Sequence, residues 1–157
     1  MLFRSEAMTE VLFYHLQNIS LESVLPPLLE KSLERGWRVV VQSTSEERAD
    51  ALDAHLWTYR DDSFLPHATW RASDAQDQPI ILAVEEGNPN GAKVRFLVDS
   101  AAMPADADSY ERMVLVFNGE DADALAAARL AWTDCKSRGF AVTYWQADEH
   151  GRWRRRE

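Results

Sequence analysis

The alternation of short apolar runs with helix-forming stretches in the first sixty residues is the feature that most constrains the fold. Residues 10–16 (EVLFYHL) and 37–42 (WRVVVQ) are rich in β-branched and aromatic side chains, which is typical of strands. Ser20 and Gly36 can cap the two ends of a helix between these runs, and a second helix is expected to end near Trp57. This strand–helix–strand–helix order predicts a parallel, doubly wound sheet.

Two prolines, Pro26 and Pro27, lie inside the first expected helix. Proline lacks the backbone N–H that an interior helical residue donates, but it is well tolerated in a first turn. The helix is therefore expected to begin near Val24 or to be kinked there.

The rest of the chain continues the α/β pattern. Further strands are expected at residues 80–84, 93–98, 112–117 and 140–145, and a further helix at residues 121–138. Residues 60–79 are expected to form a loop with embedded aromatic side chains. No internal repeat or long linker divides the chain, so one domain is expected over residues 8–148, after a disordered extension at residues 1–7.

Residues 149–157 are expected to form a basic C-terminal tail. The tail contains Arg152, Arg154, Arg155 and Arg156. One interpretation is a frayed terminus in which the arginines are simply solvated. The alternative is that the arginines and Trp153 bind single-stranded DNA directly.

Composition and charge exclude several classes of protein. A hydrophobic content of 46% and a charged content of 27% indicate a folded domain rather than a disordered or membrane-embedded chain. No signal peptide is evident, and the single cysteine, Cys135, excludes a disulfide framework and a cysteine-based zinc site. We therefore expect a reduced, cytoplasmic protein without membrane contact. The net charge of −9 argues against broad direct binding to nucleic-acid phosphates.

The usual catalytic and cofactor motifs are absent from the sequence. Gln-Asn-Ile-Ser follows the first strand where a glycine-rich loop would be needed, and no Walker loop or GxSxG elbow occurs, so no cofactor is expected. The scattered histidines are His15, His55, His67 and His150. The ring of His67 is expected to pack on its own loop and bond a backbone carbonyl, rather than to bind a metal or act in catalysis. No nucleophile–base pair is found, and an enzyme is not expected.

The helix expected at residues 121–138 carries more functional information. At about 100° per residue, one side gathers the small residues Ala124, Ala127, Ala128, Ala131 and Cys135. The opposite side gathers Leu125, Arg129, Trp132, Thr133 and Lys136. If the small side packs on the sheet, Trp132 is partly exposed between two cations, which suits an acidic peptide with an apolar anchor. Alternatively, Trp132 belongs to the core and the charges only complement the helix dipole.

Several motifs in a fixed order resemble the chi subunit family of DNA polymerase III. They are residues 51–57 (ALDAHLW) followed by 63–67 (SFLPH), then 78–82 (QPIIL), 114–117 (VLVF) and 138–140 (RGF). The resemblance extends from about Glu10 to Trp145. It implies a Rossmann-like α/β domain with a mostly parallel central sheet flanked by helices and no nucleotide-binding loop. It also implies a non-catalytic accessory subunit of the clamp-loader complex that is a monomer by itself.

The resemblance further implies a partner and a site. Chi subunits bind the acidic C-terminal tail of single-stranded-DNA-binding protein (SSB), which ends in Pro-Phe, and so they meet DNA only indirectly. The family's site lies on the last long helix, and its positions fall here on Arg129, Trp132 and Lys136. Arg129 would hold a carboxylate, Trp132 would wall the phenylalanine pocket, and Lys136 would add long-range attraction. Thr133 and Leu125 occupy positions where the family pattern has lysines, so this site is less basic than the family pattern.

A second surface implied by the resemblance would face the psi subunit, which tethers chi to the clamp loader. It falls here on Trp57, Phe64, Leu65, Pro66 and His67. The alternative is that this loop folds its apolar residues onto its own domain and that the chain reaches the clamp loader directly. Two other hypotheses remain: a nucleotide-handling or hydrolytic enzyme on a Rossmann-like fold, and a direct single-stranded DNA binder.

Overall fold

The structure, a computed structural model, describes residues 9–59, 65–148, 150 and 152–156. The strands are β1 (Glu10–Leu16), β2 (Val39–Gln42), β3 (Ala68–Thr69), β4 (Ile80–Ala83), β5 (Val94–Leu97), β6 (Arg112–Asn118), β7 (Ala141–Ala147) and β8 (Trp153–Arg156). The helices are α1 (Leu21–Glu34), α2 (Glu46–Thr58) and α3 (Ala122–Ser137). Short 3-10 helices, Ala75–Asp77 and Ala107–Ser109, lie in two of the connections. Each predicted strand and helix is found within a few residues of its predicted bounds.

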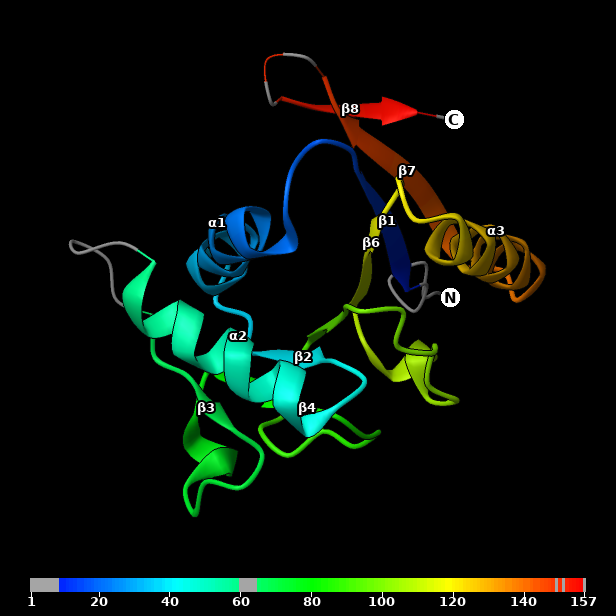
Figure 1. The fold of residues 1–157 in the computed structure, drawn as a ribbon. Helices are drawn as coiled ribbons and strands as arrows, with labels where there is room; N and C mark the ends of the chain where they lie inside the picture. Colours follow the sequence, from blue (N-terminus) through cyan, green and yellow to red (C-terminus); the bar gives the residue numbers. More distant parts are fainter. Residues whose placement is uncertain (1–8, 60–64, 149, 151, 157) are drawn as a thin grey trace.

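The strands form one sheet in the order β3-β4-β2-β5-β6-β1-β7-β8 (Figure 1). Among the described strands, every neighbouring pair is parallel except β7 and β8. Helices α1 and α2 cover one face of the sheet and α3 covers the other (Figure 1). The predicted α/β class, with a mostly parallel sheet flanked by helices, is confirmed. No helix of the described segments has both the length and the apolar character needed to cross a bilayer.

The pleat of the central strand β1 distributes its side chains between two cores. Tyr14 and Leu16 face α1 and α2, whereas Val11 and Phe13 face α3. Alternate residues of a strand point to opposite faces of the sheet, so the side chains of the neighbouring strands also alternate between the α1–α2 face and the α3 face. Tyr144 of β7 thus lies on the α3 side of the sheet.

Helix α1 begins at Leu21, directly after Ser20, and runs through both prolines, so of the two alternatives the start near Val24 is wrong. The hydroxyl oxygen of Ser20 caps it by accepting from the backbone N–H of Ser23 at 3.2 Å. In a regular helix the N–H of residue 26 would bond the carbonyl of Glu22, and Pro26 cannot supply it. Instead the ring N–H at Nε2 of His55, from α2, donates to that carbonyl at 2.7 Å. The second helix therefore satisfies a group that proline frees in the first.

The C-terminal residues Trp153–Arg156 form strand β8, so the expectation of a frayed terminus is wrong for them. Strand β8 runs antiparallel to β7, and the ring of Trp153 stacks on Tyr14 with 4.7 Å between centroids. Asp148 fixes the turn between the strands because its carboxylate accepts from the backbone N–H groups of His150 and Arg152. These bonds, with one from the Arg154 side chain, lower the pKa of Asp148 to about 2.

Candidate functional site

Helix α3 lies close to the sheet because the residues that meet it are small. Ala124, Ala128 and Cys135 are buried, and Ala131 is half-buried. Ala127, which was predicted to share this side, is exposed. Burial and the neighbouring Asp134 carboxylate raise the pKa of the Cys135 thiol to about 11, so the thiol stays protonated at neutral pH.

Trp132 is half-buried, which places it between the two alternatives that the sequence left open. Its ring stands edge-on to Phe13, 5.5 Å between centroids, and to Tyr144, 5.7 Å between centroids. The ammonium of Lys136, one turn further along α3, lies 5.5 Å from the centre of the indole ring. The core thus fixes one side of Trp132, and a cation flanks the part that solvent reaches.

Arg129 is exposed on the same side of α3 as Trp132. Its positive charge acts on the hydroxyl of Tyr144, whose pKa is raised by burial and is lowered to a smaller extent by Arg129. Exposed Thr133 donates its hydroxyl to the carbonyl of Arg129 at 3.3 Å. Leu125 is half-buried and packs on the same core as Trp132, so its role is mainly in packing.

Leu130 is a feature of this helix that the sequence analysis missed. Its side chain is 75% exposed, an unusual position for a large apolar residue. It lies at a largely apolar cavity of about 380 Å³, between α3 and the segment that follows β5, which Ala127 and Met103 also line. The sequence held one indication of this exposure: Leu130 directly follows Arg129 and lies outside the small-residue side that was predicted to pack on the sheet. Trp132 and this cavity lie on different sides of α3.

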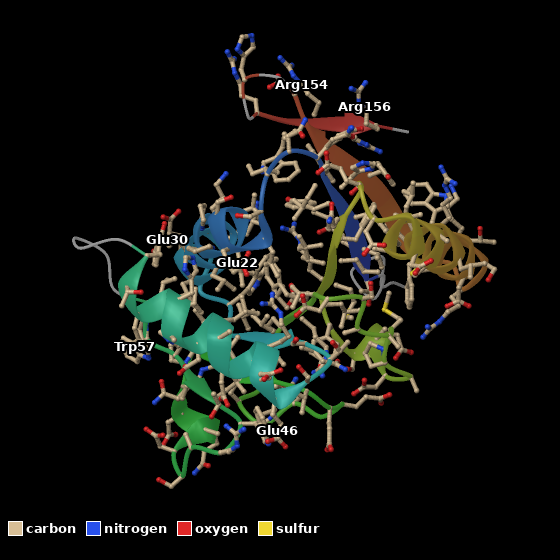
Figure 2. All side chains as sticks on the ribbon, in the orientation of Figure 1. Glu22, Glu30, Glu46, Trp57, Arg154 and Arg156 are labelled. Carbon is tan, nitrogen blue, oxygen red and sulfur yellow. The ribbon has the colours of Figure 1, made fainter. Side chains whose placement is uncertain are left out.

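The second predicted surface is mostly internal. Leu65 and His67 are buried, at 3% and 4% exposure, whereas Trp57 is 49% exposed. The ring N–H at Nδ1 of His67 donates to the carbonyl of Leu65 at 2.5 Å, and Nε2 lies 3.0 Å from the carbonyl of Asp53. Trp57 covers the imidazole, with 4.2 Å between ring centroids (Figure 2 labels Trp57). Half-buried Pro66 lies between the two buried residues, and Phe64 lies outside the described residues.

Doubly wound sheets usually bind ligands where neighbouring strands send their connections to opposite faces. Here that point is the carboxyl end of β1 and β6, where a cavity of about 610 Å³ opens between the starts of α1 and α3. The carboxylates that line it belong to Glu22, Asp99, Glu120 and Asp121. Four negative charges repel phosphate groups, which counts against a nucleotide in this cavity.

The acidic residues of this cavity already have structural partners. Asp121 caps α3 by accepting from the N–H groups of residues 123 and 124, and Asp99 accepts from Ser43 and Arg48. Among the residues that the structure describes, no cluster of three or more histidine, cysteine, aspartate or glutamate side chains is placed to hold a metal ion.

Comparison with known proteins identifies the family. The sequence model described as "DNA polymerase III chi subunit, HolC" matches residues 8–143. This chain belongs to the DNA polymerase III chi subunit family. The matched part includes all three helices and every strand but β8, with β7 reached only in part. The resemblance noted from the sequence motifs is thereby confirmed.

Two relatives carry the same family name. The "Probable DNA polymerase III subunit chi" of Rickettsia prowazekii is 29% identical over 91 residues, which are 58% of this chain and 55% of the relative. The "DNA polymerase III subunit chi" of Pseudomonas aeruginosa is 29% identical over 72 residues, 46% of this chain and 48% of the relative. The matches thus span about half the length of each relative.

Proposed function

We propose that this chi-family chain is a non-catalytic accessory subunit that binds the acidic C-terminal tail of SSB through α3. In this role it links SSB to the clamp-loader complex of the DNA polymerase III holoenzyme during replication. The observation that carries the proposal is the arrangement of Trp132, which the core holds half-buried between exposed Arg129 and Lys136. A fixed aromatic surface flanked by cations suits a peptide that combines an apolar residue with carboxylates.

Each side chain has a distinct physical task in this proposal. The guanidinium of Arg129 binds the terminal carboxylate or an aspartate of the tail, because its planar N–H groups match two carboxylate oxygens. Trp132 packs against the terminal phenylalanine and does so with little loss of entropy, since Phe13 and Tyr144 already hold its ring. Lys136 adds attraction at longer range, which salt weakens.

The terminal phenylalanine has two possible contacts on α3. One is the exposed part of Trp132, and the other is the apolar cavity beside Leu130. We favour Trp132 because Arg129 and Lys136 flank it, whereas Asp134 lines the cavity and would repel an acidic tail. Leu130→Ala is the matched comparison for Trp132→Ala, since both remove apolar surface from the same helix.

The test is titration of a labelled peptide that ends in an acidic run followed by Pro-Phe. We expect micromolar binding that is lost when the final phenylalanine is removed, weakened about tenfold or more by Arg129→Ala, and weakened by salt. Arg138→Gln removes a cation from the end of the same helix, where it pairs with Asp134, and serves as the charge-matched control. Binding that is indifferent to the final phenylalanine, or equally sensitive to both arginines, would contradict the proposal.

The contact with psi or the clamp loader is proposed at the exposed face of Trp57 and at Pro66, which precedes the His67 ring that Trp57 covers. Leu65 and His67 support this surface from below, because both are buried. Trp57→Ala is expected to reduce capture of the clamp-loader complex and to leave binding of the acidic peptide unchanged, because Trp57 lies on α2 and the peptide site lies on α3. Loss of both interactions together would indicate a folding defect instead.

A further inference from the structure

Strand β8 lies beyond residue 143, where the match to the family model ends, yet it is paired to the sheet and carries consecutive arginines. We propose that β8 extends the peptide site of α3. Arg154 and Arg156 bind the acidic stretch that precedes the apolar end of the peptide. The inference rests on the proposed function and adds a second half to the site, beyond the residues that match the family model.

The register of the hairpin determines which face each arginine occupies. Arg154 is opposite Gln146, Arg156 is opposite Tyr144, and Arg155 is opposite Trp145. Directly opposed residues of an antiparallel pair point to the same side of the sheet. Since Tyr144 lies on the α3 side, Arg156 and Arg154 project there as well, and Arg155 projects to the other face.

Tyr144 connects the two groups of cations. Its ring contacts Trp132 on α3, and the charge of Arg129 reaches its hydroxyl. Its opposed residue on β8 is Arg156, and the Cα atoms of such pairs lie about 5 Å apart. The aromatic surface of Trp132 and Tyr144 therefore has Arg129 and Lys136 on the helix side and the β8 arginines on the strand side.

The hairpin holds Arg154 in place before any peptide arrives. Its Nε donates to the Asp148 carboxylate at 3.0 Å, and the same carboxylate accepts from two backbone N–H groups of the turn. The Arg154 side chain remains 60% exposed. A guanidinium has five N–H groups, so one bond to Asp148 leaves its outer edge able to bind a second carboxylate. Figure 2 labels Arg154 and Arg156 on β8, the strand beyond β7.

An acidic peptide fits this arrangement in length and charge. An extended chain rises about 3.3 Å per residue, so about two or three residues before the terminal phenylalanine suffice to reach β8 from Trp132. The arginines would supply positive charge that Leu125 and Thr133 do not. A nucleic-acid strand is less favoured because its phosphates continue past these cations onto a chain with a net charge of −9, whereas a short carboxylate run ends among them.

The experiment compares two labelled peptides of equal length, both ending in Pro-Phe. One has a run of aspartates before that end, and the other has asparagines in their place. We expect the full chain to prefer the aspartate peptide, and we expect Arg154→Gln with Arg156→Gln to reduce this preference about fivefold at low salt. Arg155→Gln is the matched control for the single substitution Arg156→Gln, since each removes one positive charge from the same strand, on opposite faces. Arg155→Gln should leave the preference within about twofold.

The outcomes separate this inference from the proposed function. If the preference for aspartate persists in the double variant, or Arg155→Gln reduces it as much as Arg156→Gln, the β8 inference is overturned while the α3 site stands. If removal of the final phenylalanine changes nothing in the wild type, the proposed function itself fails. If an oligothymidylate displaces the aspartate peptide and loses binding in the double variant, the arginines serve nucleic acid and the inference is also overturned.

Discussion

Replacement of His55 by alanine tests whether α2 satisfies the carbonyl that Pro26 frees in α1. The bond from His55 Nε2 to the Glu22 carbonyl is short, 2.7 Å, and partly buried. A hydrogen bond of this kind contributes about 1 kcal/mol net, and leaving its acceptor without a donor costs somewhat more. We therefore expect His55→Ala to lower the free energy of unfolding by about 1 to 1.5 kcal/mol in urea denaturation.

His55 and Pro26 should therefore be energetically coupled. Pro26→Ala restores a backbone N–H that can donate to the Glu22 carbonyl, so His55→Ala should cost less in that background. The expected coupling free energy is about 0.5 to 1 kcal/mol, above the scatter of about 0.3 to 0.5 kcal/mol seen for independent sites. His55→Gln, which keeps a side-chain donor, is the control. Additive effects of the two substitutions would refute the explanation of why α1 tolerates its prolines.

Two further predictions concern the neighbourhood of β1 and the C-terminal hairpin. A Cβ at Gly119 would lie 1.9 Å from Nε2 of His15, and this ring is held in place because its Nδ1 lies 2.6 Å from the Tyr144 hydroxyl. Gly119→Ala should therefore destabilise the fold by about 1 to 3 kcal/mol. Thermal unfolding should show a smaller loss of stability when the same substitution is made in a His15→Ala background. The pKa of Asp148 is about 2, below its ordinary 3.8, so this carboxylate stabilises the hairpin fully above about pH 4 and less as the pH falls towards 2. The protection factors of the β8 amides, which correct for the intrinsic pH dependence of exchange, should fall over that window. Asp148→Asn should lower them already at neutral pH, and protection factors unchanged under both conditions would contradict the role of Asp148.

The fold was largely predictable because its signals are local. Neighbouring residues are enough to recognise the apolar runs of β1, β4 and β6 and the helix caps at Ser20 and Gly36. The sequence left the start of α1 open because the residue that compensates Pro26 is His55, which lies 33 positions beyond the Glu22 whose carbonyl it bonds. Strand β8 was missed for a similar reason: three arginines in succession look solvated until Trp153 is seen to stack on Tyr14.

The sequence predicted which residues share a side of α3, but not how deeply each of them is buried. Helical periodicity placed Arg129, Trp132 and Lys136 on one side of α3, and the structure keeps Trp132 and Lys136 in contact. Periodicity alone cannot tell how far a helix is rotated on its sheet. Ala127 is therefore exposed against expectation, and the exposure of Leu130 was not foreseen. The buried environment of His67 matches the structural interpretation, with Trp57 over its ring.

A net charge of −9 opposes an acidic ligand on average, and the arrangement of the charges explains how one can still bind. Four carboxylates gather in the cavity at the carboxyl ends of β1 and β6, where Asp121 and Asp99 also serve the fold. At physiological ionic strength exposed charges are screened beyond about 8 Å, so a bound peptide responds mainly to the side chains it touches. On the α3 face, by the present proposals, those side chains are cationic. The overall charge then acts chiefly on the rate of approach: added salt should raise the association rate slightly while it shortens the lifetime of the complex.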